Sequence, residues 1–109
     1  MSKIPLPTIG EILKEEFIDP YNISQNALAE AINVPAGRIS EIINNKRAVT
    51  ADTDLRLTKF FGLSDGYFLR LQENLDIRRT KAEIGEEINN IIPINIKSVR
   101  KNSSMAQEA

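Results

Sequence analysis

Apolar positions along the first part of the chain recur three and four residues apart, which is the spacing of amphipathic helices. The first such segment opens with Thr8 and Glu11, spaced as in a capping box, where each side chain bonds the other residue's free backbone N–H. Its apolar stripe consists of Ile9, Ile12, Leu13 and Phe17. Because Pro20 cannot continue a helix, we predict a first helix between residues 8 and 20.

Two short segments follow, with a tight turn between them. Ser24 is a favourable N-cap for residues 25–32, which are rich in alanine. Asn33 then tolerates a positive φ angle, and Pro35 is preset for the first turn of another helix. That helix carries an apolar stripe of Ile39, Ile42 and Ile43. The pattern predicts two helices joined by a turn of about three residues.

Two further helical segments complete the pattern. Thr50 can cap a segment that Gly62 closes, with apolar residues Leu55, Leu57, Phe60 and Phe61. Ser64 can cap a fifth helix, which carries Phe68, Leu71 and Leu75 on one side. We therefore predict an all-α fold with five helices over residues 8 to about 79.

The chain changes character beyond Arg79. Ile84, Ile88, Ile91 and Ile92 keep a helical period, although Gly85 weakens the helix and Pro93 stops it. We predict a helical domain over residues 1–80 and a C-terminal extension over residues 81–109, partly helical and then a tail. The isoleucine stripe is open to three interpretations: a strap on the core, a dimer element, or a docking helix for a partner.

The spacing around the tight turn is that of a helix-turn-helix. Small Ala29 suits the point where two helices cross, Asn33 the sharp turn, and Ile39 and Ile42 the return to the core. A plain helical bundle shares many of these features and stays an alternative at this point. One helix before the pair and two after it resemble the five-helix layout of phage-repressor-like DNA-binding domains.

Composition excludes several kinds of function. Of the 109 residues, 41% are hydrophobic and 27% are charged, which is ordinary for a soluble globular domain. The chain has no cysteine and no histidine, so it lacks disulfides, thiolate chemistry, and the commonest metal ligand and general base. No segment reads as a secretory signal or a membrane span. We expect a cytoplasmic protein that is not an enzyme and holds no cofactor or metal.

The net charge of −1 is unusual for a protein that binds nucleic acid. Its distribution is more informative than its total. Three positive residues and one negative residue lie between Arg38 and Arg47, whereas four acidic residues cluster earlier in the chain, namely Glu11, Glu15, Glu16 and Asp19. Such a chain can still present one basic face.

Five successive blocks of sequence resemble those of HigA-type antitoxins, within the Xre-like helix-turn-helix superfamily. The blocks are GEILKEEF at residues 10–17, SQNALA at 24–29, RISEIINNKR at 38–47, TADTDLRL at 50–57 and YFLRLQ at 67–72. They occur in the same order as in the family and cover residues 9 to about 80. Where the family has glycine this chain has Asn45, a mild departure because asparagine also accepts a left-handed backbone.

The resemblance implies a homodimeric transcription factor that represses its own operon. It also implies that the chain neutralises a co-encoded toxin, in that family an mRNA-cutting ribonuclease of the RelE-like fold. Two alternatives remain. One is a free-standing Xre-like repressor without a toxin partner, and the other is an interaction module that has lost DNA binding. An enzyme is not expected, because no residues pair a nucleophile with a base.

The resemblance implies that the helix after Pro35 reads double-stranded operator DNA. Arg38 can donate to guanine or clamp a phosphate, whereas Glu41 can accept from cytosine or pair with Arg38. Lys46 and Arg47 are expected to contact phosphates from the following loop. The full set of predicted DNA-binding residues is Gln25, Ala36, Gly37, Arg38, Ser40, Glu41, Asn44, Lys46, Arg47, Thr50 and Thr53.

The other residues of this set are expected to contact the DNA backbone or to make no side-chain contact with bases. Gln25, at the start of its helix, is placed to hold a backbone phosphate, and Thr50 and Thr53 are expected to touch phosphate. Ala36 and Gly37 offer no side-chain hydrogen bonds, so direct readout of bases is expected to be sparse. A basic patch in the tail, Lys97, Arg100 and Lys101, is either a solvated tail or an arm that contacts DNA.

Two surfaces are candidates for the toxin. The acidic cluster offers charge complementary to a basic ribonuclease, and the isoleucine stripe offers apolar area. The aromatic residues Phe60, Phe61, Tyr67 and Phe68 are expected to form core and dimer contacts instead of a base-stacking platform, since they fall at helical spacing among leucines.

Overall fold

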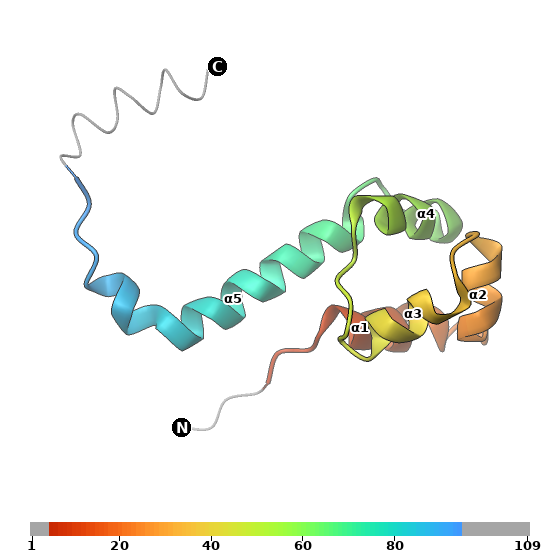
Figure 1. The fold of residues 1–109 in the computed structure, drawn as a ribbon, viewed down its shortest axis with the longest axis horizontal. Coiled ribbons are helices and arrows are strands. Elements are labelled where there is room, and N and C mark those ends of the chain that lie inside the picture. Colours follow the sequence, from red (N-terminus) through yellow and green to blue (C-terminus); the bar gives the residue numbers. More distant parts are fainter. Residues whose placement is uncertain (1–4, 95–109) are drawn as a thin grey trace, which may run out of the picture. The chain divides into compact units, whose positions relative to one another are not determined.

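The computed structural model describes residues 5–94, and this part of the chain contains helices and no strand. The elements in order are α1 (Ile9–Ile12), the π-helix η1 (Leu13–Ile18), α2 (Gln25–Ala31), α3 (Ala36–Ile43), α4 (Ala51–Phe61) and α5 (Tyr67–Asn89) (Figure 1). The chain divides into a unit that ends at Arg79 and a second unit that begins at Thr80. The predicted all-α class is confirmed. None of the described helices is long and apolar enough to cross a membrane.

The first helix begins with the predicted capping box. The Glu11 N–H donates to Thr8 Oγ1 and the Thr8 N–H donates to Glu11 Oε1, each at 3.0 Å. After Ile12 the helix widens into η1, where the Asp19 N–H donates to the Lys14 carbonyl, five residues earlier, at 2.8 Å. Leu13 and Ile18, also five residues apart, are both buried. The sequence predicted Phe17 for this stripe, but Phe17 is only partly buried and Ile18 takes the deeper position.

Local caps and turns form the helix-turn-helix as expected. Ser24 Oγ accepts from the Ala27 N–H at 3.0 Å, and Thr50 Oγ1 accepts from the Thr53 N–H at 3.4 Å. Asn33 adopts φ of +61° between α2 and α3, and Gly62 ends α4 at φ of +74°. These are left-handed conformations, which Asn and Gly adopt at low energetic cost.

The start of α5 differs from the prediction. Ser64 does not cap the helix, because its hydroxyl accepts from Arg70 Nη2 at 3.2 Å. The cap comes from Asp54 on α4, whose buried carboxylate accepts from the backbone N–H groups of Gly66, Phe68 and Leu69 at 2.7, 2.8 and 3.1 Å. A negative charge at this position also interacts favourably with the positive end of the helix dipole.

The core of the first unit gathers apolar residues from every helix of that unit. Its buried members are Ile9, Leu13, Ile18, Leu28, Ala29, Ile32, Ile39, Ile42, Val49, Leu57 and Phe68. Ala29 is buried in the helix pair, as its small size predicted. The predicted stripe of α4 is partly wrong, since Leu55 and Phe60 are 49% and 43% exposed. The helix instead buries Leu57 together with Thr53, Asp54 and Thr58.

Gly10 allows a close approach between the first helix and α3. A Cβ atom at this position would lie 2.6 Å from the Ile43 carbonyl oxygen and 2.7 Å from Ile43 Cα, and it would also collide with the Ile42 carbonyl oxygen. Backbone atoms cannot move aside as a flexible side chain can. Gly10 therefore sets how α1 packs against the end of α3.

The α5 helix continues past the predicted boundary near residue 79 and includes Gly85. Non-helical angles occur at Ile84, with φ of −119° and ψ of 21°. In the second unit Ile84, Ile88, Ile91 and Ile92 are all exposed. The core-strap, dimer and partner interpretations of this stripe all stay predictions.

Candidate nucleic-acid interface

The outer face of α3 carries the predicted reading residues. Ile39 and Ile42 are fully buried, which fixes the opposite side of the helix toward solvent. Ala36, Gly37 and Asn44 are exposed, and Arg38, Ser40 and Glu41 are half-buried. The absence of a side-chain hydrogen bond from the N-cap Pro35 leaves the start of α3 without a local cap.

Arg38 is held by the helix that follows. Its Nη1 donates to Thr53 Oγ1 at 3.4 Å, a long hydrogen bond. Thr53 was expected to touch phosphate, but only 1% of it is exposed. A side chain so deeply buried cannot reach a phosphate, so Thr53 instead helps to orient Arg38. Thr50 lies exposed at the start of α4, and its hydroxyl caps that helix.

Glu41 pairs with Arg47 and not with Arg38, the partner expected from helical spacing. Arg47 Nε donates to Glu41 Oε1 at 2.7 Å, and nearly half of each side chain is exposed. Exposed ion pairs typically contribute only about 0.2–1 kcal/mol. The pair therefore positions Arg47 beside α3 and is weak enough for Arg47 to bind another anion instead.

After α3 the chain turns sharply into the loop that carries Lys46 and Arg47, here called the cationic loop. Asn45 adopts φ of +61°, the Lys46 N–H donates to the Glu41 carbonyl at 2.8 Å, and the Asn45 N–H donates to the Ile42 carbonyl at 3.0 Å. These are the two bonds of a Schellman motif, in which Asn45 takes the left-handed position. Asn44 Nδ2 donates to the Ser40 carbonyl at 3.0 Å. Lys46 and Arg47 are both exposed.

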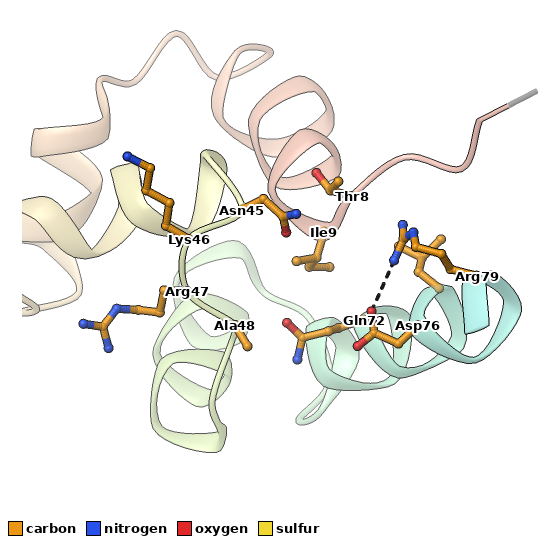
Figure 2. Close-up of a pocket in the computed structure, with 10 residues that line it drawn as sticks. Thr8, Ile9, Asn45, Lys46, Arg47, Ala48, Gln72, Asp76 and Arg79 are labelled. Atoms are coloured by element: carbon orange, nitrogen blue, oxygen red, sulfur yellow. Dashed lines mark hydrogen bonds and ion pairs between the residues drawn. The ribbon is translucent and has the colours of Figure 1, made fainter. Parts of the chain in front are cut away.

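A cavity of about 300 Å³ lies behind the cationic loop (Figure 2). In this view Lys46 and Arg47 point away from Arg79, which lies at the other side of the cavity. Gln72 on α5 braces the chain after the loop: its Oε1 accepts from the Val49 N–H at 2.8 Å, and its Nε2 donates to the Val49 carbonyl at 3.0 Å. Sequence reasoning missed Gln72, because nothing local to it signals a contact 23 residues away.

Gln25 is the first residue of α2 and is half-buried. It therefore starts the helix at which a backbone phosphate was predicted to bind. The tail residues Lys97, Arg100 and Lys101 lie outside the described residues. In all, the first unit brings the predicted set from Gln25 to Thr50 onto α2, α3 and the loop after α3, with Thr53 beneath them.

The acidic and aromatic residues lie elsewhere in the first unit. Glu11, Glu15, Glu16 and Asp19 are exposed on α1, η1 and the turn after it. Lys14 Nζ donates to Asp19 Oδ2 at 2.9 Å, and this bond raises the pKa of the Lys14 ammonium. Phe68 is core, as predicted. Phe60 is exposed, and it lines a cavity of about 320 Å³ with Tyr21, Ile23 and Phe61.

Comparison with known proteins agrees with this geometry. The helix-turn-helix family matches residues 13–68, which is more than half of the chain. Virulence-associated protein I of Dichelobacter nodosus is 40% identical over 95 residues, which span 85% of this chain and 87% of that protein. Antitoxin HigA-1 of Vibrio cholerae is 32% identical over 87 residues, which span 80% of this chain and 82% of that protein.

A solved structure is similar over the same range. The Pseudomonas aeruginosa antitoxin HigA, in a structure with the higBA promoter, superposes with a TM-score of 0.73 and is 32% identical. The match covers 82% of this chain and 98% of that one. The predicted family is thereby confirmed: the chain belongs to the Xre-like helix-turn-helix family, among its HigA-type members.

Proposed function

We propose that this chain is an antitoxin that binds operator DNA through α3, represses its own operon, and neutralises a RelE-like mRNA-cutting toxin by direct binding in the cytoplasm. The observation that carries DNA binding is the outward face of α3 with Arg38, followed directly by the exposed cations Lys46 and Arg47. The solved HigA structure with a promoter supports the same use of this fold.

The proposed mechanism follows from where α3 places Arg38 and where the loop after it places Lys46 and Arg47. A helix of this kind enters the major groove with its first turns against the base edges. Arg38 lies in the first turn of α3 and is the residue we assign to a guanine. Lys46 and Arg47 then meet the flanking phosphates, and Arg47 exchanges its bond to Glu41 for one to phosphate oxygen.

DNA binding is tested by selecting duplexes from a random-sequence library with the wild-type protein. A sequence motif should emerge, and affinity for the selected duplex should fall steeply as salt is added. Lys59→Ala is the control for replacing Lys46 or Arg47 with alanine, because Lys59 is an exposed cation in the last turn of α4 and lies outside the predicted DNA-binding set. This variant should bind the selected duplex as wild type does. No enriched motif, together with an affinity that is flat in salt, would favour the interaction-module alternative.

We propose a homodimer, because one helix-turn-helix makes few base contacts and paired half-sites about one DNA turn apart raise affinity. The exposed isoleucines of the second unit offer the apolar area that such an interface uses. Sedimentation of the full chain at micromolar concentration, with and without the selected duplex, tests this proposal. A monomer under both conditions contradicts it.

Toxin neutralisation is proposed as stoichiometric binding. The exposed carboxylates Glu11, Glu15 and Glu16 offer charge complementary to a basic ribonuclease, and the isoleucine stripe is the second candidate surface. Co-expression with the neighbouring gene tests both surfaces, using Glu15→Lys/Glu16→Lys and, separately, truncation after Thr80. If both variants still rescue growth and copurify with the toxin, both assignments are wrong. If no neighbouring gene is toxic, a free-standing repressor is the better description.

A further inference from the structure

The turn between α2 and α3 is held by a side chain from another helix. Arg56 on α4 donates from Nη1 to the carbonyl oxygens of Ile32 at 2.9 Å and of Asn33 at 3.4 Å. The Nε of the same guanidinium donates to Asp52 Oδ1 at 2.7 Å. Asp52 lies one turn earlier on α4, so the carboxylate and the guanidinium form an i, i+4 pair. Three acceptors thus hold one planar group.

We propose that Arg56 is a positioning residue that sets where the reading helix α3 begins. Ile32 is the C-cap of α2, where backbone carbonyls lack partners within the helix. Asn33 carries the left-handed φ that redirects the chain toward Pro35 and α3. A guanidinium that bonds the carbonyls of both residues restricts the peptide planes of the turn, and thereby the direction in which α3 leaves it.

The first turn of α4 also acts on the residue assigned to base reading. Arg38 and Arg56 line the same hollow of about 280 Å³, together with Asn33, Val34, Pro35 and Asp52. Thr53, the residue after Asp52, accepts from Arg38. The first two turns of α4 therefore support both the Asn33 turn, through Arg56, and the Arg38 side chain, through Thr53. A displacement of the turn between α2 and α3 would shift Arg38 relative to a base edge. Hydrogen bonds to that edge are sensitive to small changes in distance and angle.

The competing explanation is that Arg56 contacts a DNA phosphate itself. Its guanidinium already bonds one carboxylate and two carbonyls, and the Asp52 charge offsets its own. Removing a residue that neutralises a phosphate lowers the salt slope of binding by about 0.9, whereas removing a positioning residue leaves the slope unchanged. The two roles therefore have different signatures, and the positioning role predicts a loss of sequence preference alone.

The experiment compares Arg56→Gln and Arg56→Lys with wild type in the full-length chain, at a temperature where circular dichroism shows every variant folded. The probes are the duplex selected by wild type and a scrambled duplex of the same length and composition. Lysine keeps the charge but lacks the planar fork that reaches Asp52 and the carbonyls together. Both variants should lower the ratio of specific to nonspecific affinity at least about five-fold, roughly the loss of one base contact, with an unchanged salt slope.

Arg70→Gln is the matched control. Arg70 on α5 donates to the Asp65 carbonyl at 3.0 Å and to Ser64 Oγ at 3.2 Å, a similar pair of hydrogen bonds whose acceptors lie in the loop before α5. Its loss should leave the affinity ratio unchanged. A retained ratio in Arg56→Gln, or a lower salt slope in Arg56→Gln with full specificity in Arg56→Lys, overturns the positioning role.

This inference rests on DNA binding, so a readout without DNA separates the two proposals. Hydrogen exchange should accelerate in Arg56→Gln at the Val34 N–H, which bonds the Ala29 carbonyl at 3.0 Å across the turn, and stay unchanged in α5. If wild type shows no sequence preference, DNA binding fails as the function, and exchange at Val34 alone decides whether Arg56 holds the turn. Unchanged exchange at Val34 overturns the inference.

Discussion

Replacing Asp54 with alanine tests the argument that a carboxylate from α4 starts α5. The Asp54 side chain has 0% exposure and accepts three backbone hydrogen bonds, from Gly66, Phe68 and Leu69. Alanine leaves these three N–H groups without their acceptor. Each hydrogen bond to a charged group contributes about 1.5–3 kcal/mol, and neighbouring bonds are not additive, so we expect the free energy of unfolding to fall by about 3–5 kcal/mol.

Asparagine at the same position separates hydrogen bonding from packing. Its oxygen can still accept from Phe68 and Leu69, whereas its amide group would face the Gly66 N–H, which is also a donor. We expect Asp54→Asn to lose about half as much stability as Asp54→Ala. Asp65→Ala is the control, since Asp65 is exposed in the loop before α5 and its replacement should change stability by less than about 0.5 kcal/mol.

The measurement is urea unfolding followed by far-ultraviolet circular dichroism, with amide hydrogen exchange as the local readout. In Asp54→Asn the Gly66 amide should lose more protection than the Phe68 and Leu69 amides, because only the Gly66 bond is broken. The reasoning is refuted if Asp54→Ala and Asp65→Ala unfold at the same urea concentration. It is also refuted if exchange at these three amides equals that of wild type.

Four further predictions concern α3, the loop after it, and the packing of α1 against α3. Gly10→Ala should destabilise the fold by about 1–3 kcal/mol in urea unfolding, because the added Cβ meets the α3 backbone; helix propensity alone would give the opposite sign. Arg38→Ala should cost about 1–3 kcal/mol of specific affinity and relax preference at one base position in a repeated selection. Lys46→Ala and Arg47→Ala should weaken binding to every duplex and each lower the salt slope by about 0.9, so a slope equal to wild type in the double variant would place this loop away from the phosphates. Glu41→Gln should raise affinity for all duplexes in fluorescence anisotropy, since it frees Arg47 and removes a negative charge; a fall at one base pair alone would show instead that Glu41 reads cytosine.

Some features of this fold follow from short stretches of sequence. The capping box at Thr8, the caps at Ser24 and Thr50, and the left-handed turn at Asn33 were all predicted, and each depends on residues at most a few positions apart. Apolar periodicity located the helix-turn-helix pair because the spacing of a helix is a local property. The placement of Arg38 on the outer face of α3 followed from the same periodicity.

Other features depend on residues that meet only when the helices pack. The Asp54 cap, the Gln72 brace at Val49 and the Arg56 bonds to the turn join residues 12 to 24 positions apart. Periodicity carries no signal for such pairs, so the sequence predicts Ser64 as the cap of α5 and Thr53 as a phosphate contact, whereas the structure gives Asp54 as the cap and buries Thr53. Burial of Thr53 is likewise decided by which face of α4 the other helices cover. The sequence thus determined the helix-turn-helix pair and the outward face of α3, whereas tertiary packing decided which side chains hold that face in place, because those contacts cross from one helix to another.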